Sequence, residues 1–258
     1  MIDAARHGDE LYAALRERRT VPPLTAREPG ITIEDAYHVS RRLLDRRLAD
    51  GERLIGKKIG VTSKPVQRVL DVHQPDFGYL TDRMRYPDGA EMPIGRELIQ
   101  PRAEGEIAFR LARDLTGPGI TPADVLAATA CVMPCFEIVD SRIHDWKIRI
   151  QDTVADNASS GLFVLGREAS AVGFDLFSCG MVVEKNGEIL STGAGAAALG
   201  SPLGCVAWLA NTLGGFGIPL QAGEVILSGS LVPLEPVKPG DRMSLKIGGI
   251  GAASVVFT

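Results

Sequence analysis

The stretch RAEGEIAF, residues 102–109, decides how the rest of the chain is interpreted. After Glu106 it becomes apolar, which is typical of a strand that enters a protein core. Side chains two positions apart project from the same face of a strand, so we expect Glu104 and Glu106 to lie side by side. Two like charges this close repel each other, and burial strengthens the repulsion. The pattern therefore predicts a cation nearby.

A third acidic residue supports this interpretation. Glu137 lies inside the apolar run CFEIV at 135–139, where a carboxylate is costly unless it is paired or binds a metal. Three carboxylates on neighbouring strands would form a hard oxygen site, which suits Mg²⁺ or Mn²⁺. The chain has four histidines and no H-x-x-x-H spacing, which argues against a zinc site.

Ordinary ion pairs are the alternative that the pattern leaves open. A Glu-x-Glu motif on an edge strand is often a solvated face, here with Arg102 or Arg110 as a partner. Glu137 could in the same way pair with Lys58 or Arg142.

The composition limits the class of protein. The 258 residues suit one large domain or a core domain with a helical cap, and 45% hydrophobic and 23% charged residues are ordinary for a globular protein. A net charge of −4 without a long basic run argues against nucleic acid as the main partner. No unbroken apolar stretch of about 18 residues occurs, so no membrane partner is expected. The charged N-terminus lacks a signal-peptide core, and we expect a cytoplasmic protein with reduced cysteines.

Hydrophobic periodicity predicts a helical N-terminal part, followed by a mostly β body with a few helices on its outside. We divide the chain into an N-terminal region, 1–75, and a catalytic body, 76–258. Thr32 with Asp35 indicates a capping box, and Asn186-Gly187 indicates a tight hairpin turn. Helices are expected at 3–19, 32–50, 121–130 and 201–217, strands at 53–62, 77–81, 106–112, 131–140 and 223–229, and hairpins at 181–192 and 243–258.

Two lysines lie in the glycine-flanked strand GKKIGVTS, residues 56–63. Alternation sends Lys57 and Lys58 to opposite faces, so we expect one in solvent and one pointing inward. An inward lysine could hold a substrate carboxylate, or act as an acid–base group if burial lowers its pKa. Spacing alone favours the simpler alternative, in which both side chains extend to solvent.

Two further segments carry polar residues. Asp76 in HQPDFGYL (73–80) follows a proline, and turn aspartates of this kind usually bond nearby backbone amides. Asp156, Asn157, Ser159 and Ser160 crowd a polar loop just before an apolar strand, which suits substrate hydrogen bonds but is also a plain strand entry. The phosphate-binding motifs of P-loop and Rossmann proteins are absent.

Many segments in a fixed order carry a family resemblance that runs from Leu11 to Thr258. GKKIGVTSK, HQPDFGYLTD, QPRAEGEIAF, PCFEIVDSRIHDWK, DTVADNAS, TGAGAAALGSP and GEVILSGSLVPLEPVKPGD resemble the 2-oxopent-4-enoate hydratase family. This family of 2-hydroxypenta-2,4-dienoate hydratases acts in aromatic meta-cleavage pathways and belongs to the fumarylacetoacetate hydrolase superfamily. The resemblance implies an α+β fold, a mixed and mostly antiparallel β-roll with a helical N-terminal part.

The resemblance also implies a site and an activity. Mg²⁺ or Mn²⁺ would be held by Glu104, Glu106 and Glu137, with Lys58 and Asp76 as catalytic residues, and Ser159 and Ser160 would bind the substrate. The reaction would add water to 2-hydroxypenta-2,4-dienoate and give 4-hydroxy-2-oxopentanoate. The alternatives are 4-oxalocrotonate decarboxylase, 2-oxohept-3-enedioate hydratase, or a non-catalytic partner of the decarboxylase. The family forms homo-oligomers, often pentamer-based, and its hydratases can associate with the decarboxylase.

Overall fold

The structure is a computed structural model that describes residues 2–258, apart from the side chain of Val69. The helices include four short 3₁₀ turns, named η1 to η4. They are α1 (Ala4–Glu17), α2 (Leu24–Arg27), α3 (Ile33–Ala49), α4 (Lys64–Val69), η1 (Asp82–Met84), α5 (Ile94–Glu97), α6 (Pro122–Ala128), η2 (His144–Trp146), α7 (Ile150–Ala155), η3 (Asn157–Ser159), η4 (Gly195–Ala197) and α8 (Pro202–Gly214).

Two mixed sheets form the body of the molecule. The strands are β1 (Leu54–Gly60), β2 (Asp76–Thr81), β3 (Arg85–Pro87), β4 (Ala90–Met92), β5 (Arg102–Leu111), β6 (Thr129–Val139), β7 (Ser160–Leu165), β8 (Gly180–Lys185), β9 (Glu188–Ala194), β10 (Val225–Ser230), β11 (Glu235–Pro236), β12 (Arg242–Ile247) and β13 (Gly251–Phe257). The larger sheet has the order β2-β1-β10-β5-β6-β7-β3, with β11 added beside β5, and the smaller sheet has the order β4-β13-β12-β8-β9.

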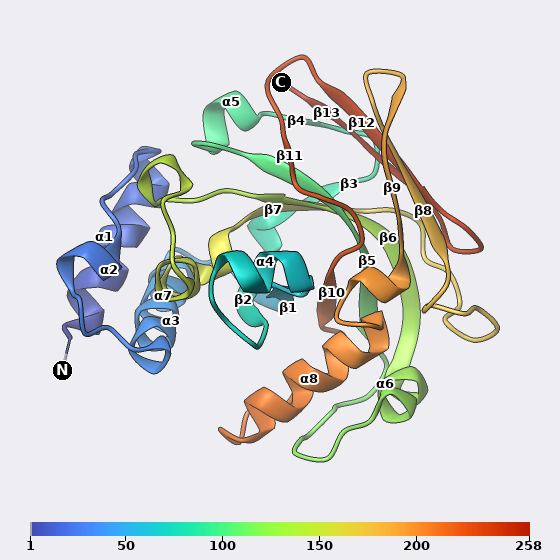
Figure 1. The fold of residues 1–258 in the computed structure, drawn as a ribbon, viewed down its shortest axis with the longest axis horizontal. Helices are drawn as coiled ribbons and strands as arrows, with labels where there is room; N and C mark the ends of the chain where they lie inside the picture. Colours follow the sequence, from blue (N-terminus) through green and yellow to red (C-terminus); the bar gives the residue numbers. More distant parts are fainter. Residues whose placement is uncertain (1) are drawn as a thin grey trace.

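Most strand pairs are antiparallel, and the parallel ones are β1 with β10, β3 with β7, and β13 with β4. In Figure 1 the N-terminal helices lie at the left, the five-stranded sheet at the upper right, and α8 along the lower edge. The predicted α+β fold, mostly antiparallel with a helical N-terminal part, is confirmed at this level. The strand β1 lies inside the larger sheet, although it precedes residue 76 in the chain.

Local sequence signals explain where several elements begin and turn. Thr32 accepts a hydrogen bond from the amide of Asp35, whose carboxylate accepts one back from the amide of Thr32, so the predicted capping box is confirmed. In the hairpin between β8 and β9, Asn186 and Gly187 have φ values of 56° and 88°, as a type I′ turn requires. The helix cap and the hairpin turn are therefore both formed by residues that favour them.

The N-terminal helices have a core of their own. Leu11 of α1 and Val39 of α3 are buried together with Ile150 and Val154 of α7, in a cluster separate from the main core between the sheets. Burying these side chains stabilises the fold by about 1.5–3 kcal/mol for each fully buried large apolar residue. The helical part is thus joined to the body through α7.

The segment Gly195–Gly214 is long and apolar enough to span a membrane by length and composition. Its helix α8, however, buries Cys205, Leu209 and Leu213 in the main core of the sheets. This is the packing of a core helix.

One sequence interpretation is wrong. The predicted polar loop after residue 152 is in fact the end of α7 and the turn η3, and its polar side chains are buried. Asp156 accepts hydrogen bonds from the backbone amide and the Nε of Arg142 at 2.9 and 2.5 Å, and Asp152 accepts one from Thr25. Polar residues in such a network satisfy one another inside the protein, so their polarity did not indicate exposure.

Candidate active site

Three acidic side chains occupy the middle of the larger sheet. Glu104 and Glu106 lie on β5, and Glu137 lies directly opposite Glu104 on β6. They are 7%, 0% and 1% exposed, respectively. Since β5 lies between β10 and β6, it is a central strand, and the alternative of a solvated edge strand is wrong.

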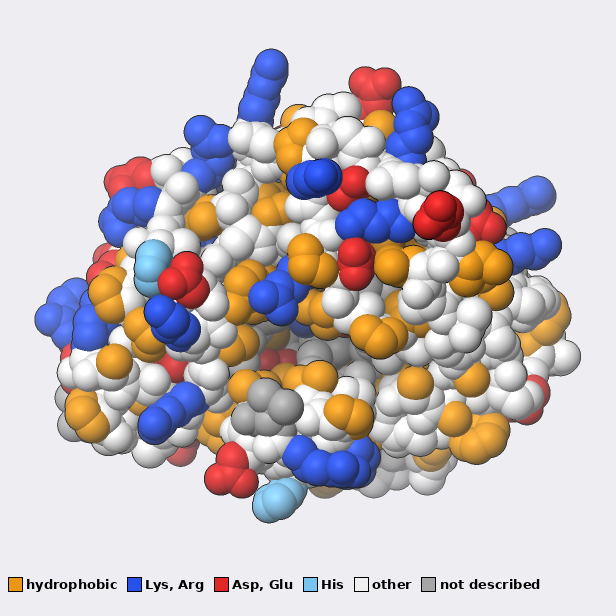
Figure 2. Space-filling view, turned by 45° about the horizontal axis from the view of Figure 1, so that its top comes forward, with side chains coloured by type: hydrophobic (Ala, Val, Ile, Leu, Met, Phe, Trp, Pro, Cys, Tyr) orange, Lys and Arg blue, Asp and Glu red, His pale blue; other side chains and the backbone are white. Residues whose placement is uncertain are grey.

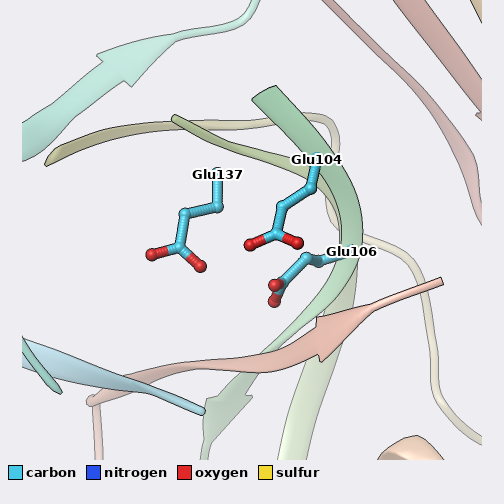
Figure 3. A group of neighbouring side chains, drawn as sticks. All are labelled: Glu104, Glu106 and Glu137. Atoms are coloured by element: carbon cyan, nitrogen blue, oxygen red, sulfur yellow. The ribbon is translucent and has the colours of Figure 1, made fainter. Parts of the chain in front are cut away.

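The three carboxylates converge on one space, as Figure 3 shows. Each offers an oxygen within 4.8 Å of the others. The amide of Gly229 donates to Oε2 of Glu106 at 2.8 Å, but Oε1 of Glu106 and both oxygens of Glu137 accept no hydrogen bond. Buried carboxylate oxygens without donors are costly, and a bound cation would satisfy them.

The neighbouring arginines are engaged elsewhere. Arg102 stacks on the ring of Trp146 at 4.6 Å, and Arg110 forms an ion pair with Glu168. The guanidinium of Arg142 is bound to Asp156. The ion pairs of the acidic residues with these three arginines, considered from the sequence, are therefore not formed.

The pKa values of the three acids reflect this crowding. Burial, and then repulsion from Glu137, raises the pKa of Glu104 to about 7. Burial together with its two acidic neighbours raises the pKa of Glu106 well above its ordinary value. Burial also raises the pKa of Glu137, although the Lys58 ammonium opposes the shift. Without a further cation, the cluster holds protons near neutral pH.

Lys58 points from β1 toward this cluster. Its Nζ lies 3.2 Å from Oε1 of Glu137 and donates a hydrogen bond to the backbone oxygen of Ala158 at 3.0 Å. Burial lowers the pKa of the lysine, but the surrounding carboxylates, Glu137 first, outweigh that effect and raise it. The acids therefore stabilise the charged form of Lys58, which is the lysine of the pair that points toward the cluster.

Lys57 corrects the sequence interpretation of this strand. It points to the opposite face, as alternation predicts, but it is 2% exposed rather than in solvent. Its Nζ lies 2.5 Å from Oε1 of Glu224, whose other oxygen accepts from the amide of Gln221. Both lysines are buried, at 2% and 3% exposed, so both faces of β1 are covered at this point and neither lysine extends to solvent.

Asp76 is the first residue of β2, and it pairs with Gly60 on β1. It is buried, and neither carboxylate oxygen has a hydrogen-bond partner, so the alternative of a backbone-bonding turn aspartate is wrong. A Cβ on Gly60 would lie 2.3 Å from Oδ1 of Asp76 and 3.2 Å from Nζ of Lys58. Because Gly60 has no side chain, the Asp76 carboxylate and the Lys58 ammonium group can both occupy the space beside it.

The two candidate serines lie on the neighbouring segment, and both are buried. The hydroxyl of Ser159 is 3.2 Å from that of Thr153, and the hydroxyl of Ser160 donates to the backbone oxygen of Asn157 at 2.7 Å. These bonds lie within the protein, and the role of the two serines in substrate binding stays a prediction.

The sequence did not indicate the backbone oxygen of Ala158 as the partner of Lys58. An alanine has no side-chain signal for such a role, because the oxygen is presented by the conformation of the turn. The sequence indicates Asn157 only as one of several polar residues in this segment.

The charges of the site fit a hard divalent cation. Four buried carboxylates, those of Asp76 and the three glutamates, face one ammonium group. All the side-chain ligand atoms offered by the glutamates are oxygens, the donors that Mg²⁺ and Mn²⁺ prefer. Figure 2 shows a hollow near the middle of one face of the molecule, with acidic side-chain atoms inside it. The arrangement can hold a metal ion and place an anionic oxygen of a small molecule near a lysine.

Known proteins resemble this chain along most of its length. The family model described as fumarylacetoacetate (FAA) hydrolase C-terminal matches residues 54–257. A 2-hydroxypent-2,4-dienoate hydratase from Pseudomonas putida is 73% identical over 212 residues, which cover 82% of this chain and 96% of that protein. A 2-hydroxyhexa-2,4-dienoate hydratase from Comamonas testosteroni is 61% identical over 253 residues, 97% of this chain and 96% of that protein.

A solved structure is similar throughout. The 4-oxalocrotonate decarboxylase from Pseudomonas putida G7, complexed with magnesium and adipate, has a TM-score of 0.96 to this chain at 37% identity. The match covers 99% of this chain and 97% of the decarboxylase. The family expected from the sequence segments is confirmed, and the chain belongs to the fumarylacetoacetate hydrolase family.

Proposed function

We propose that the chain is a hydro-lyase that adds water to 2-hydroxypenta-2,4-dienoate and gives 4-hydroxy-2-oxopentanoate, in the meta-cleavage degradation of aromatic compounds. The observation that carries this proposal is the buried group of three glutamates beside Lys58, in a chain 73% identical to a hydratase of that name. Lys58 is the cation that acts on all three glutamates, and a single ammonium group suits a substrate with a single carboxylate.

The metal would be Mg²⁺ or Mn²⁺, held by Glu104, Glu106 and Glu137. When bound, the ion supplies a Lewis acid that stabilises negative charge developing on the 2-oxygen of the substrate. The metal ligands must be ionised to bind it, so the raised pKa values of these acids couple metal binding to proton release.

Lys58 and Asp76 would handle the protons of the reaction. The dienol first becomes an α,β-unsaturated ketone: its 2-hydroxyl loses a proton as a proton is added at C5. Water then attacks C4 and gives up a proton, and a proton is added at C3. The Nζ of Lys58 would balance the charge of the carboxylate or enolate oxygen and hold a proton beside it. Asp76, whose oxygens have no hydrogen-bond partner, would orient the attacking water and accept its proton. Ser159 and Ser160 would bind the polar end of the substrate.

The test is turnover by the purified chain with Mg²⁺. Loss of the ultraviolet absorbance of the dienol, with a product one water heavier, is the expected result. Release of CO₂ from 4-oxalocrotonate would instead favour the decarboxylase, the alternative suggested by the similar solved structure. Hydration of 2-oxohept-3-enedioate in preference to the shorter substrate would favour the dicarboxylate hydratase. Inactivity of the chain alone would favour a non-catalytic partner.

Several finer features belong to the same proposal. The body, 76–258, would be the β-roll of this family, and the region 1–75 would contribute the lysine through β1. The chain would act in the cytoplasm as a homo-oligomer, pentamer-based, and associate with 4-oxalocrotonate decarboxylase. Sedimentation velocity of the purified chain would test the assembly.

Magnesium affinity is expected to fall as the pH is lowered through about 7. In the metal-free protein the pKa of Glu104 is raised to about 7, so below that pH the site holds protons that Mg²⁺ must displace. Above it the Glu104 carboxylate is ionised, so this residue no longer releases a proton when Mg²⁺ binds. Calorimetric titration in two buffers with different ionisation enthalpies should show more protons released per Mg²⁺ at about pH 6 than at about pH 8. Equal proton release at both values would contradict the assignment.

Replacing Gly60 by alanine is expected to lower kcat by about 10–100-fold, because a displacement of about 1 Å at reacting groups can have that effect. The added Cβ would lie 2.3 Å from Oδ1 of Asp76, so the carboxylate must move. Gly180→Ala on β8 is the matched control, since no atom lies within 4 Å of its added Cβ. Steady-state kinetics of both variants should show the loss only at Gly60, and equal rates would remove Asp76 from the mechanism.

A further inference from the structure

The turn η3 has an unusual backbone. Three successive residues that are not glycine, Asn157, Ala158 and Ser159, have φ values of 55°, 51° and 52°. This left-handed conformation brings Cβ close to the backbone of an L-residue, and it normally occurs at single positions. A run of three persists only where the surrounding structure determines it, and such strain is often found at functional sites.

The side chain of Asn157 holds the turn against β2. Its Oδ1 accepts from the backbone amide of Tyr79 at 2.7 Å, and its Nδ2 donates to the backbone oxygen of Tyr79 at 3.0 Å. The preceding residue of β2 is Gly78, where a Cβ would lie 2.4 Å from the backbone oxygen of Asn157. Glycine at this position thus allows the turn to approach the strand, and the asparagine then fastens it there.

The same turn contacts two other strands of the site. The backbone oxygen of Ala158 accepts the hydrogen bond of Lys58 Nζ, and the backbone oxygen of Ser159 accepts from the amide of Asp140, just beyond the end of β6. Lys58 lies on β1 opposite Gly78 of β2. The turn is therefore bound to β2 through Tyr79 and to the adjacent strand β1 through Lys58. The left-handed run therefore sets where the Ala158 oxygen, and with it the ammonium group, lies.

We propose that Asn157 is a positioning residue for the reaction: it fastens the left-handed turn to β2 so that the oxygen of Ala158 fixes the ammonium group of Lys58 beside the carboxylates. This inference rests on the proposed function for its kinetic consequence, but the placement of Lys58 can be observed without any activity. Asn157 itself touches neither Lys58 nor the acids through a hydrogen bond in the described residues.

The chain offers a matched control in Asn186. This residue has nearly the same φ, 56°, and its amide also makes two hydrogen bonds, accepting from the amide of Arg242 and donating to Asp241. It lies in the hairpin of the five-stranded sheet, away from the acids. Replacing either asparagine by alanine removes two hydrogen bonds and leaves a left-handed residue, so stability effects common to both can be separated from effects on the reaction.

The experiment compares Asn157→Ala, Asn157→Gly, Asn186→Ala and Asn186→Gly with the unmodified chain. We expect kcat to fall about 10–100-fold in both Asn157 variants, with KM little changed, and to stay near the unmodified value in both Asn186 variants. Glycine adopts positive φ without strain, so Asn157→Gly keeps the test valid if the alanine variant does not fold. Unchanged kcat in Asn157→Gly, or an equal loss in Asn186→Gly, would overturn the proposal.

A crystal structure of Asn157→Gly supplies the readout that does not depend on activity. We expect Nζ of Lys58 to leave the oxygen of Ala158, and an unchanged hydrogen bond would overturn the proposal. If the unmodified chain does not hydrate the dienoate, the proposed function fails, whereas the position of Lys58 in this variant still decides the present inference.

Discussion

Replacing Glu106 by glutamine is expected to lower kcat by about 10³-fold or more, because the loss of a bound Lewis acid removes several kcal/mol of charge stabilisation from the transition state. Glutamine has nearly the same shape and can still accept the hydrogen bond of the Gly229 amide, so the fold should persist. What it removes is one negative charge from a buried group of like charges.

Thermal unfolding gives this variant a second signature. Without metal, Glu106→Gln should be at least as stable as the unmodified chain, because a neutral glutamine avoids the cost of burying either a charge or an acid that must take up a proton. With Mg²⁺, it should gain less stability than the unmodified chain, since stabilisation by a ligand follows its affinity. Glu168→Gln is the control: Glu168 is an exposed partner of Arg110, and its replacement should change stability by less than about 0.5 kcal/mol. Full turnover with an unchanged response to Mg²⁺ would remove Glu106 from the site.

Replacing Lys58 by methionine is expected to reduce both stability and activity. The change leaves Glu137 and Asp76 without their ammonium neighbour, and breaking a buried ion pair in this way costs about 3–5 kcal/mol in the free energy of unfolding. The kcat should fall by about 10²–10⁴-fold if the lysine handles protons. Mg²⁺ should restore part of the stability, because it supplies positive charge to the same carboxylates.

Lys57→Met is the matched control for this variant, one position along the same strand. It breaks the buried pair with Glu224 and should also lower the free energy of unfolding by about 3–5 kcal/mol. Its kcat per folded molecule should stay near that of the unmodified chain. Mg²⁺ should stabilise this variant by no more than it stabilises the unmodified chain. Chemical unfolding with and without Mg²⁺, beside steady-state kinetics, measures all of these quantities. Equal kinetic losses in the two variants would show that Lys58 acts only through the fold.

Much of the fold can be predicted from the sequence, because many of its elements depend only on residues that are adjacent in the chain. The capping box at Thr32, the turn at Asn186-Gly187 and the apolar runs of β6 and β10 each depend on a few adjacent residues. The glutamates were accessible for the same reason, since the two-residue period of a strand places Glu104 and Glu106 on one face.

The features that were missed depend on tertiary contacts. Lys57 is buried on a covered face of β1, and its partner Glu224 lies 167 positions away in the chain. The polar segment that includes the end of α7 was predicted as a loop, because its Asp152 is satisfied by Thr25, 127 positions away in the chain. The oxygen of Ala158 is a backbone atom, and its position depends on contacts of its turn with β1, with β2 and with Asp140 after β6. Local patterns cannot indicate such long-range partners.

The small core that α7 shares with the N-terminal helices suggests how the active site of this fold could change during evolution. Val154 packs among residues of α1 and α3, and two positions beyond Ala155 the chain enters the turn that contacts Lys58. The glutamates, by contrast, are fixed by the backbone pairing of β5 and β6. Substitutions in the outer helices can therefore change the surroundings of the lysine while the three glutamates keep their positions on β5 and β6. Such changes offer evolution a route from one lyase chemistry to another.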